Sequence, residues 1–431
     1  MNSLTVTDGT GSVPPGELRM RELQQDKVEG ERSGGEGGIK GTEREVQSTQ
    51  RYQLHSQKMS ALMHLPPTMR ALRYNDATRV LSLEEIPTPK ELGDWDVLVK
   101  VAYVGVCGTD LHITEGHFPC RHGGLTLGHE ISGVVEAVGS NVPHVKKGTH
   151  VAVNPHGGCG VCDQCDRGHP NYCTGLGEGS SLGFHVDGGF ADFVVAPAGK
   201  VRKMPDNIGL ETAGAIETLS CIYRGRENIG PLCQDARILI LGGGVVGLIW
   251  ASYFHHEGIR KIIMSEPRPE RQKTARNMGI GIEVVSPNEL EELLGNKDPC
   301  IDVVVDCCGI AAAVQGSMKY MARGSTLMCF ACAPPTQKLT ITMLDIYMKE
   351  LKIIGSLHNP LNFSKVIALT ANMAEKYLNC EKLGIKIYQL EDFKQCFDDL
   401  KKGVITKGVF EINPNPVTHD AEMTEVQKPE S

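Results

Sequence analysis

The chain has 431 residues, of which 40% are hydrophobic and 22% charged, and its formal net charge is -8 at pH 7. This length allows two or three domains with hydrophobic cores, and the composition is typical of a globular protein. The charge is modestly negative, and no block of lysine and arginine alternates with aromatic residues, which disfavours nucleic acid as a partner. No apolar run is long enough to span a bilayer, so no membrane partner is expected.

The two ends of the chain are polar. Residues 1–67 are rich in Gly, Ser, Glu, Lys and Gln, which predicts a disordered extension because such a segment has no apolar face to bury. Acidic residues balance its arginines, which disfavours a mitochondrial presequence. Residues 414–431 are predicted to form a second disordered tail. The fifteen cysteines follow no apolar signal segment, so a cytoplasmic location with reduced thiols is expected.

The segment after the extension is predicted to be mostly β-structure. Residues 68–205 contain short apolar or alternating runs that are broken by Gly and Pro, and such runs predict β-strands. The clearest runs are residues 69–74, 96–104, 133–138 and 150–153.

From about Asp235 onward, strand-like runs alternate with helical segments. Strands are predicted at residues 237–241, 261–265, 301–306, 325–330 and 351–355, with a helix at 248–256. Strands that alternate with helices predict a parallel sheet covered on both faces, so the expected fold class is α/β. The last predicted elements are a helix at 362–377 and strands at 386–390 and 408–412.

Cysteines are closely spaced in one stretch of the β-rich segment. Two residues separate Cys159 from Cys162 and Cys162 from Cys165, and seven residues separate Cys165 from Cys173. Thiolates are soft ligands, and zinc accepts four of them in a closed structural site. Ordinary buried thiols or disulfides are the alternative, which the regular spacing disfavours. We therefore predict a structural zinc site here.

A second set of metal-ligand residue types precedes these cysteines. Cys107 lies in Gly105-Val-Cys-Gly-Thr-Asp-Leu-His, and His129 and Glu130 follow about twenty residues later. A thiol, an imidazole and a carboxylate would leave one zinc position for water or substrate, as a catalytic site requires. Taken singly, each residue could be an ordinary core or surface residue. Their nearness to the four cysteines favours a catalytic zinc site.

A glycine-rich segment directly follows a predicted strand and opens a predicted helix. Its residues Gly242, Gly244, Val246 and Gly247 predict a dinucleotide site, because the glycines allow a tight turn, close backbone approach and close helix packing. The helix N-terminus would offer free N–H groups to the phosphates. Glu266 ends the next strand, where a carboxylate accepts from the ribose hydroxyls of NAD and repels the extra phosphate of NADP.

NAD is therefore the expected cofactor, and NADP is the alternative. Arg268 and Arg271 lie shortly after Glu266, and arginines near the ribose can bind a 2′-phosphate. The choice between the two nucleotides depends on which of these charges faces the ribose.

The order of these motifs resembles the zinc-dependent medium-chain alcohol and polyol dehydrogenases, in particular the branch with sorbitol, arabinitol, butanediol and threonine dehydrogenases. The resemblance runs from about Met69 to Asn413. It implies a GroES-like catalytic domain at 68–222, a Rossmann NAD-binding domain at 223–358, and a return to the catalytic domain at 359–413. It also implies a homo-oligomer, either a dimer or a tetramer.

The resemblance also implies roles for further residues. Thr109 and His112 match the family's proton relay, in which a hydroxyl takes the alcohol proton and an imidazole passes it outward. Glu217 matches a glutamate that binds zinc directly or through its water, so either Glu130 or Glu217 is the third protein ligand. Arg271 matches an arginine that occurs together with NAD in the polyol branch.

The sequence departs from the family pattern at two places. Thr218 follows Glu217 where proline is usual, which puts the local turn in question. Leu357-His358-Asn359 stands where sorbitol dehydrogenases have an arginine and an aromatic residue, so sorbitol itself is less favoured.

The expected function is hydride transfer between NAD and a secondary alcohol, with a polyol as the favoured substrate and a ketone as the product. Zinc would make loss of the hydroxyl proton feasible near neutral pH. Alternatives are a threonine or diol dehydrogenase, a catalytically silent binding or structural protein of the same fold, and a metal-free quinone reductase. The three residues of the open zinc set disfavour the last two.

Overall fold

The computed structural model describes residues 62–174 and 181–413. The predicted tail at 414–431 and most of the predicted extension at 1–67 lie outside these residues. The last residues of the extension are packed, because Leu62 and Leu65 are buried in a cluster with Met69 and Leu98. Within the described ranges, no helix combines the length and apolar character needed to cross a membrane.

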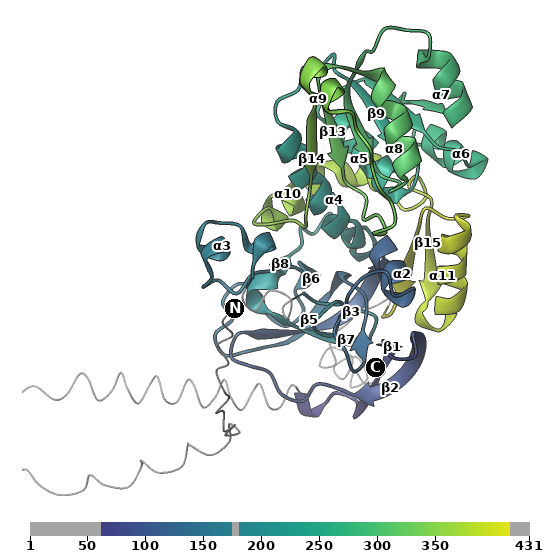
Figure 1. Cartoon of the computed structure of the whole chain (residues 1–431). Coiled ribbons are helices and arrows are strands. Elements are labelled where there is room, and N and C mark those ends of the chain that lie inside the picture. The colour runs from purple at the N-terminus through teal and green to yellow at the C-terminus, as the bar shows by residue number, and fades with distance from the viewer. Residues whose placement is uncertain (1–61, 175–180, 414–431) are drawn as a thin grey trace, which may run out of the picture. The chain divides into compact units, whose positions relative to one another are not determined.

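The β-rich part contains two sheets whose strands pair in antiparallel fashion, apart from one parallel pair at the end of the larger sheet (Figure 1). The small one has the strand order β2-β1-β4: β1 is Thr68–Asn75, β2 Val80–Pro87 and β4 Leu125–Thr126. The seven-stranded sheet has the order β15-β16-β3-β5-β6-β8, and β7 also pairs with β3. Its strands are β3 Asp96–Val106, β5 Glu130–Val138, β6 His150–Val153, β7 Phe193–Pro197, β8 Val201–Lys203, β15 Ile385–Gln389 and β16 Lys407–Glu411.

The other sheet is parallel and has six strands in the order β11-β10-β9-β12-β13-β14. The strands are β9 Arg237–Leu241, β10 Lys261–Ser265, β11 Glu283–Val285, β12 Ile301–Asp306, β13 Met321–Cys329 and β14 Lys352–Gly355. Its helices are α5 Val245–His256, α6 Pro269–Asn277, α7 Pro287–Leu294, α8 Ala311–Ser317, α9 Met343–Lys349 and α10 Phe363–Tyr377.

The apolar runs of the central strands are explained by burial on both faces. In β9, Ile238 and Ile240 belong to one hydrophobic cluster, and Leu239 and Leu241 belong to another. Successive side chains of a strand point to opposite faces, so a strand covered by helices on both sides has no polar face. The predicted parallel sheet with two covered faces is therefore confirmed.

The predicted strands are all present, with ends that shift by a few residues. The predicted helix at 248–256 begins earlier, at Val245, because Gly244 is its N-cap. The last residues of the glycine-rich segment thus form the first helical turn.

Helix α4, Leu210–Ile229, was not expected as a long helix. It packs on β5 and β6 of the β-rich part and on α5 and α10 beside the parallel sheet. Residues 214–220 are all buried, so the middle of this helix shows no amphipathic period that a sequence pattern could reveal.

The end of the chain returns to the seven-stranded sheet. Helix α11, Phe393–Lys402, packs on β16. Strand β16 pairs in antiparallel register with β3, where Gly408 lies opposite Val106. This pairing brings Lys407 next to the segment that carries Cys107.

We expect the fold to have no room for a side chain at Gly247. A Cβ at this position would lie 2.0 Å from the carbonyl oxygen of Gly242, so α5 would have to move away from the turn that precedes it. We expect Gly247→Ala to destabilise the protein by roughly 1–3 kcal/mol, as for other overpacked sites. Thermal unfolding in the absence of nucleotide measures this effect.

Gly316→Ala is the matched control. Gly316 lies in α8, where an added Cβ would meet nothing within 4 Å, so its melting temperature should stay the same or rise slightly. Equal melting temperatures for the two variants would contradict the close packing of α5 on the turn.

Candidate active site and metal centres

The predicted catalytic and cofactor segments meet at one cavity of about 540 Å³. Cys107, His129 and Glu217 line it from the β-rich part and α4, while Gly244 and Arg271 line it from the parallel-sheet part. A cavity at the carboxyl ends of parallel strands is where doubly wound folds bind ligands. The predicted metal ligands and the predicted nucleotide-binding residues therefore line the same cavity.

The register of two strands brings Cys107, His129 and Glu130 together. Gly105 in β3 lies directly opposite Glu130 in β5, so Cys107 follows the end of one strand and His129 precedes the start of the other. The three candidate ligand atoms all lie within 4.8 Å of one another. A Cβ on Gly105 would lie 2.0 Å from Glu130 Oε2, so only glycine leaves room for the carboxylate.

Helix α2, Gly108–Thr114, holds Cys107 as its N-cap residue. The Cys107 backbone N–H donates to Asp110 Oδ2 at 2.8 Å, and Asp110 Oδ1 lies 3.5 Å from His129 Nδ1. Burial favours the neutral form of His129, but the charges of Asp110 and Cys107 outweigh it and raise the pKa of His129 well above its ordinary value. The site thus stabilises positive charge at this point, as a cation site should.

Glu130 has a partner that the sequence analysis missed. Lys407 Nζ lies 2.7 Å from Oε1 and 2.5 Å from Oε2 of the buried carboxylate, and Thr218 Oγ1 donates to Oε1 at 3.3 Å. Burial raises the pKa of Glu130, and Lys407 opposes this rise. A single lysine before an apolar strand resembles a solvated charge, so no sequence pattern marks this contact.

Glu217 lies on α4 and is also buried. Its Oε1 accepts a hydrogen bond from Cys221 Sγ at 3.3 Å and lies 3.5 Å from His156 Nε2. Thr218 does not interrupt the helix, which runs unbroken through this position. Glu217 faces the cavity but lies outside the group whose ligand atoms fall within 4.8 Å of one another.

A wall of aromatic rings closes another side of the cavity. The rings of His156 and His358 stack with centroids 3.8 Å apart and an interplanar angle of 12°, and Phe184 stacks on His156. Burial lowers the pKa of His156 well below its ordinary value, and burial together with His156 lowers the pKa of His358 to about 3. Both imidazoles are therefore neutral near pH 7. His156 was missed, because one histidine after a strand forms no motif.

The two residues of the predicted proton relay lie on α2 and line the same cavity. Thr109 Oγ1 is 3.6 Å from Cys107 Sγ. His112 Nδ1 is buried and has no hydrogen-bond partner among the described residues. The hydroxyl therefore lies beside the candidate metal ligands, and the imidazole retains a nitrogen for another partner.

The glycine-rich turn has the geometry of a nucleotide cradle. Gly242 has a φ of 105°, which favours glycine, and α5 begins immediately afterwards. Glu266 is buried, and its Oε2 accepts a hydrogen bond from the Gly243 backbone N–H at 2.7 Å. The carboxylate therefore lies against the turn, as an acceptor for ribose hydroxyls would. A Cβ on Gly244 would meet only Arg271, at 3.8 Å, so the cradle is open at this point.

The two arginines that follow Glu266 have different surroundings. Arg271 lines the cavity, and its Nη2 donates to the carbonyl of Ile405 at 3.3 Å. Arg268 donates from Nη1 to the carbonyl of Lys402 at 3.0 Å. Of the two arginines, Arg271 is thus the one that lines the cavity.

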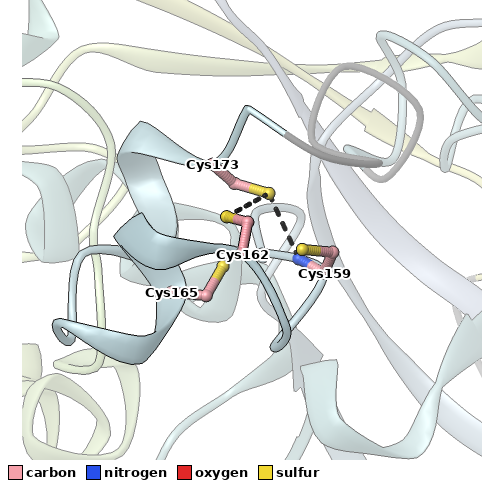
Figure 2. Close-up of side chains that lie close together, drawn as sticks. All are labelled: Cys159, Cys162, Cys165 and Cys173. Atoms are coloured by element: carbon pink, nitrogen blue, oxygen red, sulfur yellow. Dashed lines mark hydrogen bonds between the residues drawn. The ribbon is translucent and has the colours of Figure 1, made fainter.

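The four closely spaced cysteines converge in a separate lobe. Figure 2 shows their side chains gathered around one point, with Cys159, Cys162, Cys165 and Cys173 contributed by helix α3, Asp163–Asp166, and its flanking turns. All four sulfur atoms lie within 4.8 Å of one another, and Cys162 Sγ is 3.7 Å from Cys173 Sγ. Backbone N–H groups lower the pKa of Cys162 to about 5. Four converging thiols, one already favouring the thiolate, fit a closed zinc site.

Comparison with known proteins gives the family. Residues 93–206 match the family model of the alcohol dehydrogenase GroES-like domain, and residues 245–388 match that of the zinc-binding dehydrogenases. The chain is 31% identical to starvation-sensing protein RspB of Escherichia coli K12 over 287 residues, which cover 66% of this chain and 81% of that protein. It is 28% identical to D-arabinitol dehydrogenase 1 of Uromyces fabae over 347 residues, 79% of this chain and 96% of that protein.

A solved structure shows the same fold over the same extent. It is a proposed zinc-binding dehydrogenase from Sinorhizobium meliloti 1021 bound to NADP, with a TM-score of 0.73 and 28% identity, and the match covers 80% of this chain and 100% of that one. The β-rich part is thus the GroES-like domain and the parallel sheet is the Rossmann domain. With this fold and these matches, the chain belongs to the zinc-dependent medium-chain alcohol and polyol dehydrogenase family, as an oxidoreductase that transfers a hydride between a nicotinamide nucleotide and an alcohol.

Proposed function

We propose that this protein uses NAD to oxidise one secondary hydroxyl of a polyol to a ketone. The observation that carries the proposal is the convergence of Cys107, His129 and Glu130 with the glycine-rich turn on one cavity. A metal-binding set and a nucleotide cradle that face the same space can hold the reacting carbon and the hydride acceptor together, which is the main requirement for hydride transfer.

Cys107, His129 and Glu130 would hold the catalytic zinc. Between the two glutamates left open by the sequence, the distances favour Glu130, because its oxygen lies within 4.8 Å of the other two ligand atoms. Glu217 also lines the cavity, and would act through a bound water rather than as a direct ligand. When bound, the zinc would supply a Lewis acid that acidifies the substrate hydroxyl, and the nicotinamide would supply the hydride acceptor.

The chain's own residues would remove the proton. The Thr109 hydroxyl lies next to Cys107, where it can accept the proton of a substrate hydroxyl while passing its own on. His112 is three residues further along α2 and lines the same cavity. Within the part of the chain that the structure describes, its Nδ1 has no hydrogen-bond partner, which leaves the ring free to take up a proton and carry it outward.

The stacked imidazoles of His156 and His358 favour an uncharged substrate. Neutral His156 and His358 can donate and accept hydrogen bonds, which suits the several hydroxyls of a polyol. They offer no positive charge to the carboxylate of an amino acid such as threonine. Threonine is therefore the less favoured substrate class, although both classes occur among similar dehydrogenases.

A substrate panel tests the proposal. Polyols of four to six carbons, vicinal diols and threonine would each be offered with NAD, and the absorbance of the reduced nucleotide would be followed. We expect turnover with at least one polyol, and loss of turnover in Cys107→Ser. Nucleotide binding in that variant should remain nearly intact, because the thiol lies on a different domain from the cradle. Full activity in a variant shown to lack the catalytic metal would rule out the mechanism.

We also propose that the four-cysteine lobe holds a structural zinc. Cys162→Ser should lower the melting temperature and weaken assembly more than it affects chemistry, because a closed metal site contributes to the folding free energy. The control is Cys233→Ser, since Cys233 is exposed. A Cys162→Ser protein with unchanged melting but lost turnover would mean that the roles of the two metal sites are reversed.

The preference for NAD over NADP rests on Glu266. Its buried carboxylate at the turn would repel a 2′-phosphate, whereas Arg271 at the cavity wall would attract one. We expect Glu266→Ser to lower the ratio of kcat/KM for NAD to kcat/KM for NADP by about 10- to 100-fold. The reason is that a charge contact of this kind is worth on the order of 1.5–3 kcal/mol. The ratio of kcat/KM for the two nucleotides measures this change.

Glu270→Ser is the control for that experiment, since Glu270 is exposed in the first turn of α6. Its ratio should equal that of the wild type. An unchanged ratio in Glu266→Ser, or a wild type that already prefers NADP, would mean that Glu266 does not contact the ribose. The Sinorhizobium meliloti relative binds NADP, so this outcome is a real alternative.

We further propose that the protein is a cytoplasmic homo-oligomer, a dimer or a tetramer. Strand β14 is the edge of the parallel sheet, and α9 exposes large apolar side chains near it, among them Met343, Leu344 and Tyr347 at 79%, 63% and 78%. An open edge strand beside exposed apolar residues favours pairing with a second copy. Thiol ligands for zinc favour a reducing compartment.

A further inference from the structure

A third group of metal-ligand side chains lies on α2 and the turn that follows it. The candidate ligand atoms of His112, Glu115 and His117 are all within 4.8 Å of one another. This group does not overlap with the two zinc sites discussed above. His112 is shared with the cavity, whereas His117 is exposed.

The backbone explains why two histidines meet here. Helix α2 ends in a Schellman turn: the Gly116 N–H donates to the Ile113 carbonyl at 2.9 Å and the His117 N–H donates to the His112 carbonyl at 2.8 Å. Gly116 has a φ of 74°, as this motif requires. The motif places the side chains of positions 112 and 117 in contact, and this contact is usually apolar. Here both residues are imidazoles, with ring centroids 6.3 Å apart.

The present partners of this group are weak. Glu115 lies 3.3 Å from Lys401 Nζ and 3.5 Å from His117 Nδ1, and the side chains of both Glu115 and Lys401 are more than one-third exposed. Exposed ion pairs contribute about 0–1 kcal/mol. His112 Nδ1 has no hydrogen-bond partner among the described residues. A divalent ion could therefore recruit all three side chains at little cost in lost contacts.

The donor set indicates the metal. Two imidazoles and one carboxylate are a common zinc set, and three ligands suffice for a site that also binds water. The site is open to solvent on the side of His117, so the ion would exchange with the medium. An ordinary solvated helix end with one His–Glu ion pair is the alternative.

We propose that His112, Glu115 and His117 form a third, exchangeable Zn²⁺ site, and that zinc bound there inhibits the enzyme. The inhibition rests on the proposed function, in which the His112 ring carries the substrate proton. A relay through an imidazole needs both ring nitrogens, one to accept a proton and the other to release one. A nitrogen that coordinates a metal can do neither, so an occupied site interrupts the relay. The binding itself does not depend on that role.

The test uses the full-length zinc-loaded enzyme freed of loosely bound metal by dialysis. Zinc chloride is titrated in a calorimeter, and turnover is measured in parallel at the same zinc concentrations. We expect the wild type to bind one zinc ion more than the starting preparation and to lose turnover as that ion binds. In His117→Ala, both curves should move to at least about 10-fold higher zinc, since even residues that only support a metal ligand contribute 10–100-fold.

His122→Ala is the matched control. His122 is also an exposed histidine with a carboxylate partner, Asp76, at 2.5 Å, and it belongs to none of the metal-ligand groups found among the described residues. This variant should bind zinc and lose turnover as the wild type does.

Two outcomes would overturn the inference. If His117→Ala binds zinc and is inhibited like the wild type, there is no site at these residues. If the extra zinc binds through His117 but turnover is unaffected, the inhibition is wrong, and the relay role of His112 falls with it. Because calorimetry needs no turnover, a failure of the proposed function can be distinguished from a failure of the metal site.

Discussion

The pairing of β3 with β5 is the constraint on which the candidate active site depends. Gly105 lies opposite Glu130, and the absence of a side chain on Gly105 creates the space that the carboxylate occupies. The same register puts Cys107 and His129 at adjoining strand ends. A shift of β5 by one residue against β3 would turn Glu130 to the opposite face of the sheet, so its carboxylate could no longer converge with Cys107.

A buried carboxylate also needs a partner, and the partner comes from far along the sequence. Lys407 begins β16, the strand on the other side of β3 from β5. Removing one member of a buried ion pair leaves an uncompensated charge, which is strongly destabilising. The end of the chain, which returns to the GroES-like domain, supplies the charge that allows Glu130 to be buried. This return therefore contributes to the site as well as to the fold.

Much of this arrangement follows from local sequence patterns. Apolar runs predicted the strands, because a covered sheet buries both faces of each strand. Two sets of metal-ligand residues predicted groups that the structure brings together: the four cysteines at 159, 162, 165 and 173, and Cys107 with His129 and Glu130. Lys407, His156 and Cys221 could not be predicted in this way, because each is a single residue whose burial arises from contacts between distant elements. Helix α4 was missed for a related reason, since the buried residues 214–220 leave no polar face.

The charges buried around Cys107 affect which ion can bind there. When all four acidic groups are ionised, Cys107, Asp110, Glu130 and Glu217 carry four negative charges, and Lys407 offsets one of them. In a region of low permittivity, a divalent cation therefore reduces the excess of negative charge further than a monovalent ion does. Without any ion, the same imbalance is relieved by proton uptake, which is consistent with the raised pKa of His129. Metal and protons therefore compete for this pocket, and acidification of the medium favours departure of the metal.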